Sequence, residues 1–317
     1  MRFMLLASAL LSTVSPSLAL AQTNTQDETG PIVLRVPASA RALALGGVYP
    51  GLAPDPDAIY YNPALLQSAT GLSLAAQMWG SASRLYTFAG TNGAGFGFGV
   101  QFLDYEVAAL TPAGNIGSPF GLSRDGGRAS GELNATIGYA RTFFGRLRLG
   151  IAAKAARHLG ADQSAGIAAL DIGTWMNPFN WLNVSLAAQN LGGSLVFNGA
   201  EYDLPMRAVL NAFTRSRTIG PLDLAVGARV SAGPDEDVGA GLGVEVGYWP
   251  FAGLNFYARA GVKLGTGEYN VGGLADPIEE VPFTAGGGVS WGRLSLDYAL
   301  EPYSGAAHAH RIGLRVR

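Results

Sequence analysis

The sequence predicts an all-β protein, a 14-stranded antiparallel transmembrane β-barrel preceded by an irregular N-terminal segment. The first observation is a hydrophobic period of two, which begins at Gly71 and is typical of strands with one apolar face. The second is that turn residues divide this region into fourteen segments. The third is length: most segments have about 9 to 13 residues, near the 9–11 that a tilted strand needs to cross a bilayer.

Residues Met1 to Ala21 have the features of a secretory signal peptide. Arg2 supplies a positive charge, Phe3 to Leu11 form an apolar core, and Ala19-Leu20-Ala21 is a small-x-small cleavage site. A membrane anchor is the alternative, but polar residues and Pro16 interrupt the apolar run well short of the ~20 residues that a spanning helix needs. We therefore expect cleavage after Ala21 and export of the chain.

The composition fits an exported membrane protein and excludes several other classes. Charged residues make up 14% of the chain, against about 25% in soluble proteins. The net charge of −2 gives no basic surface for nucleic acid. The chain has no cysteine, which excludes disulfides, thiol chemistry and a lipoprotein anchor. No later segment is long and apolar enough for a spanning helix, so membrane insertion would require strands.

Residues 22–70 form the region ahead of the strands. Gln22 to Gly30 is polar, and Pro31 to Val36 is predicted as a short lead-in strand. The stretch from Arg41 to Gln67 holds the densest set of turn-forming residues in the chain. We expect it to be compact and irregular, with short helical turns at most. The pair Tyr60-Tyr61 gives it apolar surface to bury.

An ordered set of residues runs through this stretch and carries a family resemblance. The set consists of Arg41 and Ala42, Leu45-Gly46-Gly47, Tyr49, the acidic pair Asp55 and Asp57, and Tyr60-Tyr61-Asn62-Pro63-Ala64. It resembles the N-terminal signature of the PorV/PorQ family of outer-membrane proteins, relatives of the FadL transporters of hydrophobic compounds. The resemblance implies a FadL-like barrel of fourteen strands in which this stretch folds inside the lumen as a gating hatch. The expected organisation is therefore a signal peptide (1–21), a lead-in and hatch (22–70) and a barrel (71–317).

The strands should place apolar side chains outward and polar side chains in the lumen. In Leu254 to Leu264, one face is apolar while the other carries Arg259. The segment from Arg293 to Glu301 repeats this pattern, with Arg293 and Asp297 on the inward face. Alternation alone would also fit a soluble sandwich. Segment length and number favour the barrel, because soluble strands centre near 5–6 residues and membrane barrels of this kind have an even number of strands.

The fourteen predicted strands span most of the chain after residue 70. They are 71–80, 83–92, 94–109, 129–143, 146–160, 164–177, 181–191, 205–215, 221–232, 237–249, 254–265, 282–291, 293–303 and 309–317. The longest connections, 110–128 and 266–281, are the predicted outward-facing loops. Aromatic residues near strand ends fit the interfacial girdles of a membrane barrel. They are Trp79, Trp175, Trp181, Trp249, Trp291 and Tyr303.

One predicted strand is unusually rich in glycine. In Gly93 to Val100, glycine occupies every position expected to face the lumen, at Gly93, Gly95, Gly97 and Gly99. Glycine weakens a strand by roughly 0.5–1 kcal/mol, so the row indicates that something packs closely against this wall. We expect that to be the hatch, through Tyr60, Tyr61 and Asn62. A phosphate-binding loop is excluded because no helix follows. The FadL resemblance also implies a kink and a lateral exit in an early strand such as this one.

No catalytic residue, metal site or cofactor is expected. His158 has no evident serine partner, and His308 and His310 share a face at i, i+2 at the start of the final strand. A two-histidine metal site is the alternative for that pair, but ordinary polar strand residues explain it more simply. The lumen carboxylates alternate with arginines, so a solvated or mutually paired lining is expected rather than an acid-base pair.

The resemblance implies two functions for a protein of the bacterial outer membrane. One is a hatch-gated channel or transporter for hydrophobic small molecules. The other is a component of the type IX secretion system that docks or shuttles secreted cargo. The chain is short for a FadL transporter, which favours the PorV/PorQ side. The expected partners are outer-membrane lipid and either a hydrophobic small molecule or secretion-system subunits, with no nucleic acid.

Overall fold

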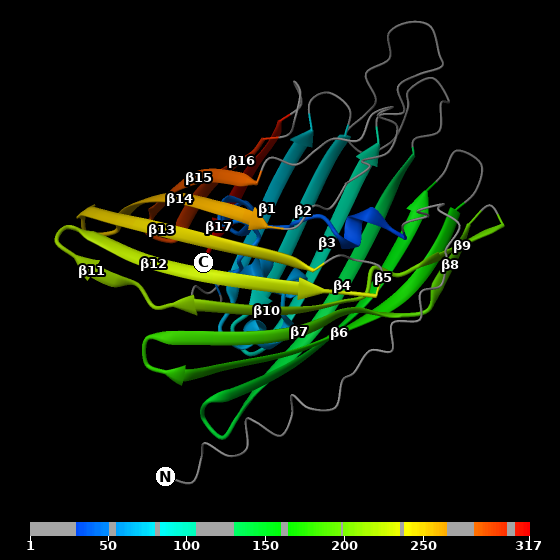
Figure 1. Cartoon of the computed structure of the whole chain (residues 1–317), viewed down its shortest axis with the longest axis horizontal. Helices are drawn as coiled ribbons and strands as arrows, with labels where there is room; N and C mark the ends of the chain where they lie inside the picture. Colours follow the sequence, from blue (N-terminus) through cyan, green and yellow to red (C-terminus); the bar gives the residue numbers. More distant parts are fainter. Residues whose placement is uncertain are drawn as a thin grey trace, which may run out of the picture.

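A computed structural model describes residues 30–50, 55–79, 83–105, 130–159, 164–197, 199–234, 238–264, 282–302 and 308–317 (Figure 1). The expected signal peptide, the two long connections and Tyr303 lie outside these residues. Within the described part of the chain, no helix has the length and apolar character needed to span a membrane.

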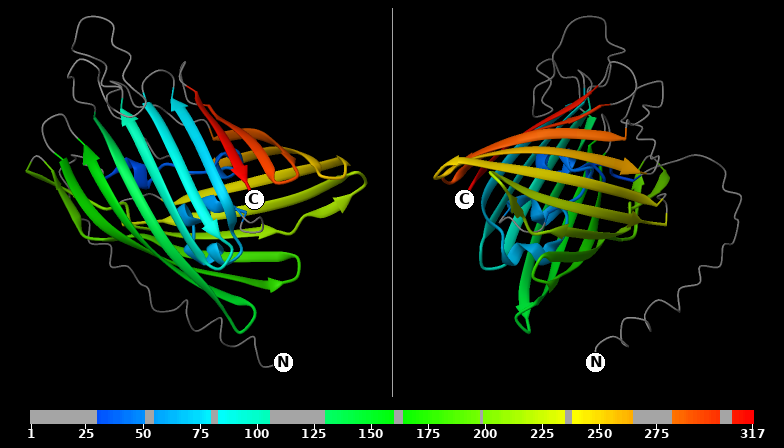
Figure 2. Two further views of the ribbon diagram at one scale, coloured as in Figure 1. Left: turned by 180° about the vertical axis from the view of Figure 1, so that it is seen from behind. Right: turned by 60° about the vertical axis from the view of Figure 1, so that its left-hand side comes forward.

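Long strands form one closed antiparallel sheet, with the barrel wall seen from two further sides in Figure 2. The fourteen strands of the wall in the described residues are β1 (Thr70–Trp79), β2 (Ser83–Asn92), β3 (Phe96–Tyr105), β4 (Ser130–Phe143), β5 (Leu147–Leu159), β6 (Ser164–Phe179), β7 (Leu182–Gly192), β10 (Arg207–Thr214), β12 (Leu222–Ala232), β13 (Gly239–Phe251), β14 (Leu254–Leu264), β15 (Phe283–Trp291), β16 (Leu294–Glu301) and β17 (Ala309–Val316). The predicted 14-stranded antiparallel barrel is confirmed.

The barrel closes where the first strand meets the last. β1 pairs with β17 from Leu72 opposite Val316 to Trp79 opposite Ala309. Every other wall strand pairs with its neighbours along the chain, including β10 with β12. A closed meander leaves no sheet edge exposed, which is the condition for placing a sheet in lipid.

Three short strands lie outside the predicted set. β11 (Arg217–Ile219) prolongs the hairpin between β10 and β12 by pairing with the start of β12. β8 (Ser194–Phe197) and β9 (Ala200–Asp203) form a separate two-stranded hairpin between β7 and β10. These strands have only three or four residues, too few for a period of two to be distinguished from a loop.

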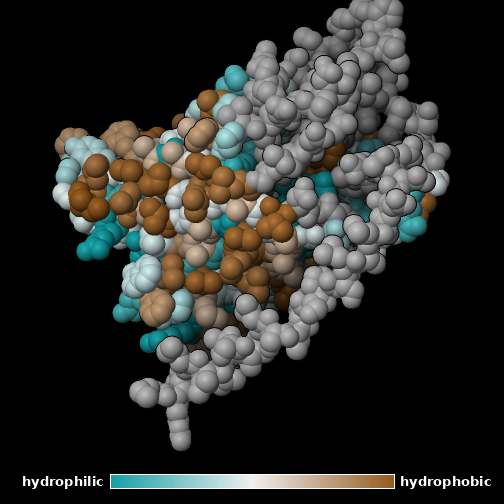
Figure 3. Space-filling view, in the orientation of Figure 1, coloured by the Kyte–Doolittle hydropathy of each residue, from teal (hydrophilic) through white to brown (hydrophobic). Residues whose placement is uncertain are grey.

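The predicted facing of the strands is confirmed. On β14, Phe256 is 45% exposed while Arg259 is 5% exposed, and on β16 the outward Leu296 alternates with the buried Asp297. Outward side chains are largely apolar around the wall, and Figure 3 shows them gathered in a band over the strands nearest the viewer. The lumen face instead carries most of the buried polar and charged side chains of the strands.

The interpretation of the aromatic residues as a girdle is correct only in part. Trp181, Trp249 and Trp291 are exposed, as a girdle requires. Trp79 and Trp175 are buried and face the lumen. The reason is strand parity: Trp175 lies an even number of positions from the lumen-facing Asp171, so it shares the same face.

The kink expected in the glycine-rich strand is absent from the described pairs. β3 keeps an unbroken register with both β2 and β4. The register shifts instead between β6 and β7, at Leu170/Ile172, where Asn190 adopts a φ of 57°. Two further shifts lie between β6 and β7 at Met176/Phe179 and between β13 and β14 at Tyr248/Phe251.

The residues that precede β1 lie inside the barrel, and we call residues 30–69 the hatch segment. Its described elements are η1 (Ile32–Leu34), α1 (Ala40–Ala44), η2 (Pro56–Tyr60) and η3 (Pro63–Gln67). α1 packs on β14 to β17, η2 on β1 to β3, and η3 on β4 to β6. Contacts to opposite parts of a closed wall place the segment in the lumen, where Figures 1 and 2 show its short blue helices. The predicted lead-in strand is wrong, since η1 is a 3-10 turn.

Candidate functional site: the hatch segment and its lumen contacts

The hatch segment is an irregular chain that is almost entirely removed from solvent. None of its described residues is exposed. Two of its turns begin with the same local device: an Asx side chain accepts a hydrogen bond from the backbone two residues on, and a proline follows it. Asp55 Oδ1 accepts from the Asp57 N–H at 3.2 Å, and Asn62 Oδ1 accepts from the Ala64 N–H at 2.9 Å. This device starts a helix at each point.

A chain of alternating charges fastens the hatch segment to one side of the wall. Arg41 of α1 donates to Glu245 of β13 through two bonds of 2.8 and 2.6 Å. Arg259 of β14 donates to Glu245 at 2.6 Å and to Asp297 of β16 at 2.5 Å. Arg315 of β17 then bonds Asp297. We call this set, completed by Asp55, the charge latch.

Asp55 closes the charge latch on the hatch side. Its Oδ2 accepts from Arg315 Nη1 at 2.7 Å. Three arginines therefore face three carboxylates, and all six side chains are buried. Burial of unpaired charges would be strongly unfavourable, so the latch is stable only while each charge keeps its partner. Movement of the hatch segment would separate Arg41 from Glu245 and Asp55 from Arg315.

Asp57 lies beside the charge latch, but no arginine of the described residues forms an ion pair with it. Its carboxylate accepts a hydrogen bond from the Ser73 hydroxyl of β1. Burial, followed by repulsion from Asp55, raises the pKa of Asp57 to about 7, while Ser73 and Arg315 act in the opposite direction. The charge of this hatch residue therefore changes near neutral pH.

Arg311 of β17 holds the start of the hatch through its backbone. Its guanidinium donates to the Pro37 carbonyl at 2.8 Å and to the Ala38 carbonyl. It also donates to Gln77 of β1 and Thr87 of β2. Because carbonyl groups have the same chemistry in every residue, this contact fixes the path of the chain rather than a particular side chain.

The aromatic residues of the hatch contact different parts of the lumen. Tyr60 Oη lies 2.6 Å from the Phe88 carbonyl and 3.1 Å from the Val100 carbonyl, between β2 and β3. Tyr61 instead stacks on Tyr49 with ring centroids 4.3 Å apart. Burial raises the pKa of Tyr61 to about 12, so its hydroxyl is neutral when it accepts from the backbone N–H groups of residues 38 and 39.

Asn62 lies against the wall of β6 and β7 rather than the predicted glycine row. Its Nδ2 donates to the Thr174 and Leu186 carbonyls at 3.0 and 3.2 Å. Gln189 of β7 supports the same turn by donating to the backbone carbonyls of Tyr60 and Tyr61. Of the three residues expected at the Gly93–Gly99 wall, only Tyr60 is there.

Lumen-facing glycines leave room for the hatch on almost every side. A Cβ at Gly99 would lie 2.5 Å from Tyr60 Oη, and a Cβ at Gly97 would lie 2.6 Å from the Leu66 side chain. The same crowding occurs opposite other hatch residues, at Gly138, Gly150, Gly173, Gly227, Gly241, Gly243, Gly261 and Gly286. Any larger residue at these positions would push the hatch away. Gly46 and Gly47 of the hatch itself have φ of 67° and 82°, which strongly favours glycine.

Three of the predicted lumen-wall residues lie elsewhere. Gly93 and Gly95 belong to the bend between β2 and β3, with φ of 73° and 96°, because β3 begins only at Phe96. Arg293 lies in the turn between β15 and β16 and is exposed. The turn shortens the expected strand by one residue and removes Arg293 from the wall. Gly97, Gly99, Arg259 and Asp297 are on the lumen face.

Several lumen residues at the hatch were not among the predicted site residues. They are Glu245, Arg311, Arg315 and Gln189. Each is a polar residue at an inward strand position, so strand parity places it on the lumen face but does not identify it as a hatch contact. His158 lies 3.4 Å from Glu132, and His310 Nδ1 lies 2.7 Å from Tyr298 Oη. No group of three or more metal-binding side chains occurs in the described part of the chain.

Comparison with known proteins reveals the fold. No family model and no curated protein matches the sequence. The chain is similar to the toluene transporter TodX of Pseudomonas putida, with a TM-score of 0.53, 11% identity, and coverage of 92% of this chain and 98% of TodX. The toluene transporter TbuX of Ralstonia pickettii has a TM-score of 0.51 and 14% identity, with coverage of 92% of this chain and 99% of TbuX. The monoaromatic hydrocarbon channel CymD has a TM-score of 0.51 and 10% identity, with coverage of 87% of this chain and 95% of CymD. The chain therefore has the fold of the FadL-like fourteen-stranded barrels.

Proposed function

We propose that this protein is a bacterial outer-membrane channel for small hydrophobic molecules and that the hatch segment is its gate. The observation that carries the proposal is a plug with polar attachments: an irregular segment lies in the lumen and is fastened to the wall by ion pairs at Arg41 and Asp55. A segment that served only as packing would be expected to use apolar contacts, because a buried ion pair is a poor source of stability.

The outer surface supports a place in a bilayer. Leucine, isoleucine, valine and aromatic side chains are exposed on the outward face of the strands, and a large exposed apolar surface marks a membrane or protein contact. Export through cleavage after Ala21 would deliver the chain to the outer membrane, where barrels of this kind reside.

The class of transported molecule is inferred from the fold and from the side chains that line the lumen. The comparison proteins that share the fold carry toluene or monoaromatic hydrocarbons by name. The lumen of this chain offers aromatic surface where Tyr49 and Tyr61 of the hatch pack near Trp175 of the wall. Small apolar or aromatic molecules are therefore the proposed substrates.

A role in type IX secretion is the second candidate. It is supported by the ordered residues from Arg41 to Pro63, which resemble the PorV/PorQ signature, and by the tight packing of that segment against the wall glycines. A firmly held plug suits a barrel that docks cargo without conducting it.

The triple substitution Tyr60→Ala, Tyr61→Ala and Asn62→Ala tests both candidates. It removes the side-chain contacts of Tyr60 and Asn62 with the wall and the stack of Tyr61 on Tyr49. The strands are left intact, so the barrel should still migrate as a folded, heat-modifiable species. A channel should take up toluene at a changed rate in cells that express the variant, relative to the outward-facing control Tyr248→Ala. A secretion component should lose cargo release with no change in uptake. Unchanged behaviour in both assays would contradict gating by the hatch.

A further inference from the structure

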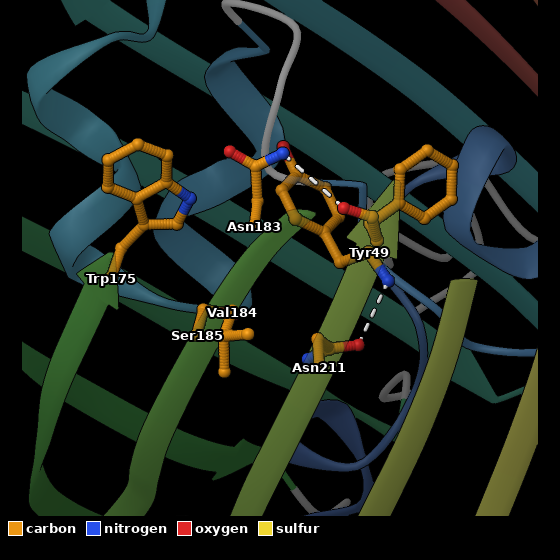
Figure 4. A pocket seen from close by; sticks show the side chains of 7 residues that line it. Tyr49, Trp175, Asn183, Val184, Ser185 and Asn211 are labelled. Carbon is orange, nitrogen blue, oxygen red and sulfur yellow. Dashed lines mark hydrogen bonds between the residues drawn. The ribbon is translucent and has the colours of Figure 1, made fainter. Parts of the chain in front are cut away.

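A narrow hollow separates the hatch segment from the wall formed by β6, β7 and β10 (Figure 4). Its aromatic lining comes from Tyr49 of the hatch and from Trp175 and Phe213 of the wall. Its polar lining includes Asn183 and Asn211. The hollow therefore combines flat apolar surfaces with a small number of polar groups, the composition of a site for a small molecule.

Two polar atoms of the hollow have no hydrogen-bond partner among the described residues. They are the indole nitrogen of Trp175 and the side-chain oxygen of Asn183. Trp175 is 7% exposed and Asn183 is 3% exposed. The amide of Asn183 is oriented by its Nδ2, which donates to the Phe213 carbonyl at 3.3 Å, so the oxygen remains free to accept. Figure 4 shows the indole nitrogen and this oxygen turned toward the same gap.

Water does not satisfy this pair in the observed arrangement. The hollow is so narrow that no space within it is wide enough for a water molecule. Tyr49 forms the cover: its backbone N–H donates to Asn211 Oδ1 at 3.2 Å, and its ring stacks on Tyr61. A buried donor and a buried acceptor are thus both left without a partner, which is unfavourable unless another state of the hatch completes their bonds.

Building on the channel function proposed above, we infer that Trp175 and Asn183 form the polar half of a subsite for a small aromatic molecule that carries a hydroxyl group. Tyr49 is the movable cover of this subsite. A hydroxyl group is both a donor and an acceptor, so one such group can accept from the Trp175 N–H and donate to the Asn183 oxygen. The ring of the molecule would pack on the aromatic faces of Trp175 and Phe213.

This subsite would discriminate between substrates of nearly equal size. Phenol and toluene differ by a hydroxyl in place of a methyl group. Toluene in the subsite would leave both polar atoms unpaired, whereas phenol would satisfy both, and unpaired buried polar groups are the strongest source of discrimination between such analogues. The subsite therefore selects hydroxylated aromatic molecules over hydrocarbons.

Ligand-observed NMR titration of the full-length protein in detergent micelles tests the inference, with phenol and toluene as probes. Trp175→Phe keeps an aromatic ring but removes the donor, and it should weaken phenol binding about 2- to 10-fold, the value of one hydrogen bond, without changing toluene binding. Asn183→Leu should have the same selective effect. Trp181→Phe, an exposed tryptophan on the outer surface, is the matched control and should change neither.

Each outcome decides the inference. If Trp175→Phe weakens the binding of phenol and toluene equally, the indole has only a packing role and the inference is overturned. Unchanged phenol binding in both Trp175→Phe and Asn183→Leu would also overturn the inference. The same titrations in Asp55→Asn, which releases one latch contact, should strengthen phenol binding because the cover moves more easily. Uptake of toluene by cells is measured separately: failure of uptake contradicts the channel function, while failure of phenol selectivity with normal uptake contradicts only the subsite.

Discussion

Asp55 and Arg315 form a buried ion pair of 2.7 Å although 260 positions separate them in the chain. Asp55 belongs to the hatch segment and Arg315 to the final strand. The pair can form only when β17 is in place, and β17 is also the strand that closes the barrel on β1. Fastening of the hatch is therefore coupled to barrel closure, and the contact is a direct target for mutation.

Asp55→Asn should loosen the hatch segment without unfolding the barrel. The substitution leaves Arg315 with Asp297 as its remaining partner, and loss of one buried charge pair costs about 2–5 kcal/mol. Protease digestion of folded barrels should cut residues 30–69 faster in the variant, while heat modifiability on gels stays normal. Asp223→Asn is the control, because Asp223 pairs with Thr218 on the wall and not with the hatch. Equal protection of the two variants would mean that the latch does not hold the hatch.

Asp57 should make attachment of the hatch weaker as the pH rises. Its pKa is raised from 3.8 to about 7 in the folded protein, so the folded state binds a proton more tightly than the unfolded state. The favourable contribution is complete below about pH 4 and is lost as the pH rises toward 7. The protease protection of the hatch should therefore fall between pH 5 and pH 8 in the wild type. Asp57→Asn should flatten this dependence, whereas an unchanged slope would point to another titrating group.

Gly99→Ala should displace Tyr60 from the wall. The new Cβ would lie 2.5 Å from Tyr60 Oη, and overpacking of this kind costs roughly 1–3 kcal/mol. Gly166→Ala, where the nearest atom would be 3.6 Å away, is the matched control. The measurement is the midpoint of thermal unfolding. It is compared among Gly99→Ala, Gly166→Ala and the double variant that combines Gly99→Ala with Tyr60→Ala. If the clash is the cause, the second substitution should make Gly99→Ala nearly neutral; additive losses would exclude the contact.

Leu296→Arg should impair folding into bilayers far more than Leu296→Phe. Leu296 is outward-facing and 46% exposed near the middle of β16. An arginine on the lipid face near the bilayer midplane costs about 2–4 kcal/mol, whereas phenylalanine stays apolar. Refolding titrations into lipid vesicles measure the difference. Similar midpoints would show that this face of β16 does not contact lipid.

The number, length and facing of the strands could be predicted from the sequence because they are local properties. A period of two places Phe256 and Arg259 on opposite faces without any knowledge of their neighbours. The dense turn residues from Arg41 to Gln67 likewise identified a separate, irregular segment. Short elements such as β8 and β9 were missed because they contain too few residues to show a period.

The partners of the hatch were decided only by the tertiary structure. Strand parity assigned Asp297 to the lumen, but only the folded barrel places it between Arg259 and Arg315, where exchange for a neutral residue would remove a shared charge partner of two buried arginines. Parity also governs Trp175, which a girdle interpretation placed on the wrong face. A closed barrel brings β13, β17 and the hatch together across more than 200 positions. Ion pairing and close packing depend on distances in space, and no local pattern in the chain encodes which inward residue will meet which part of the hatch.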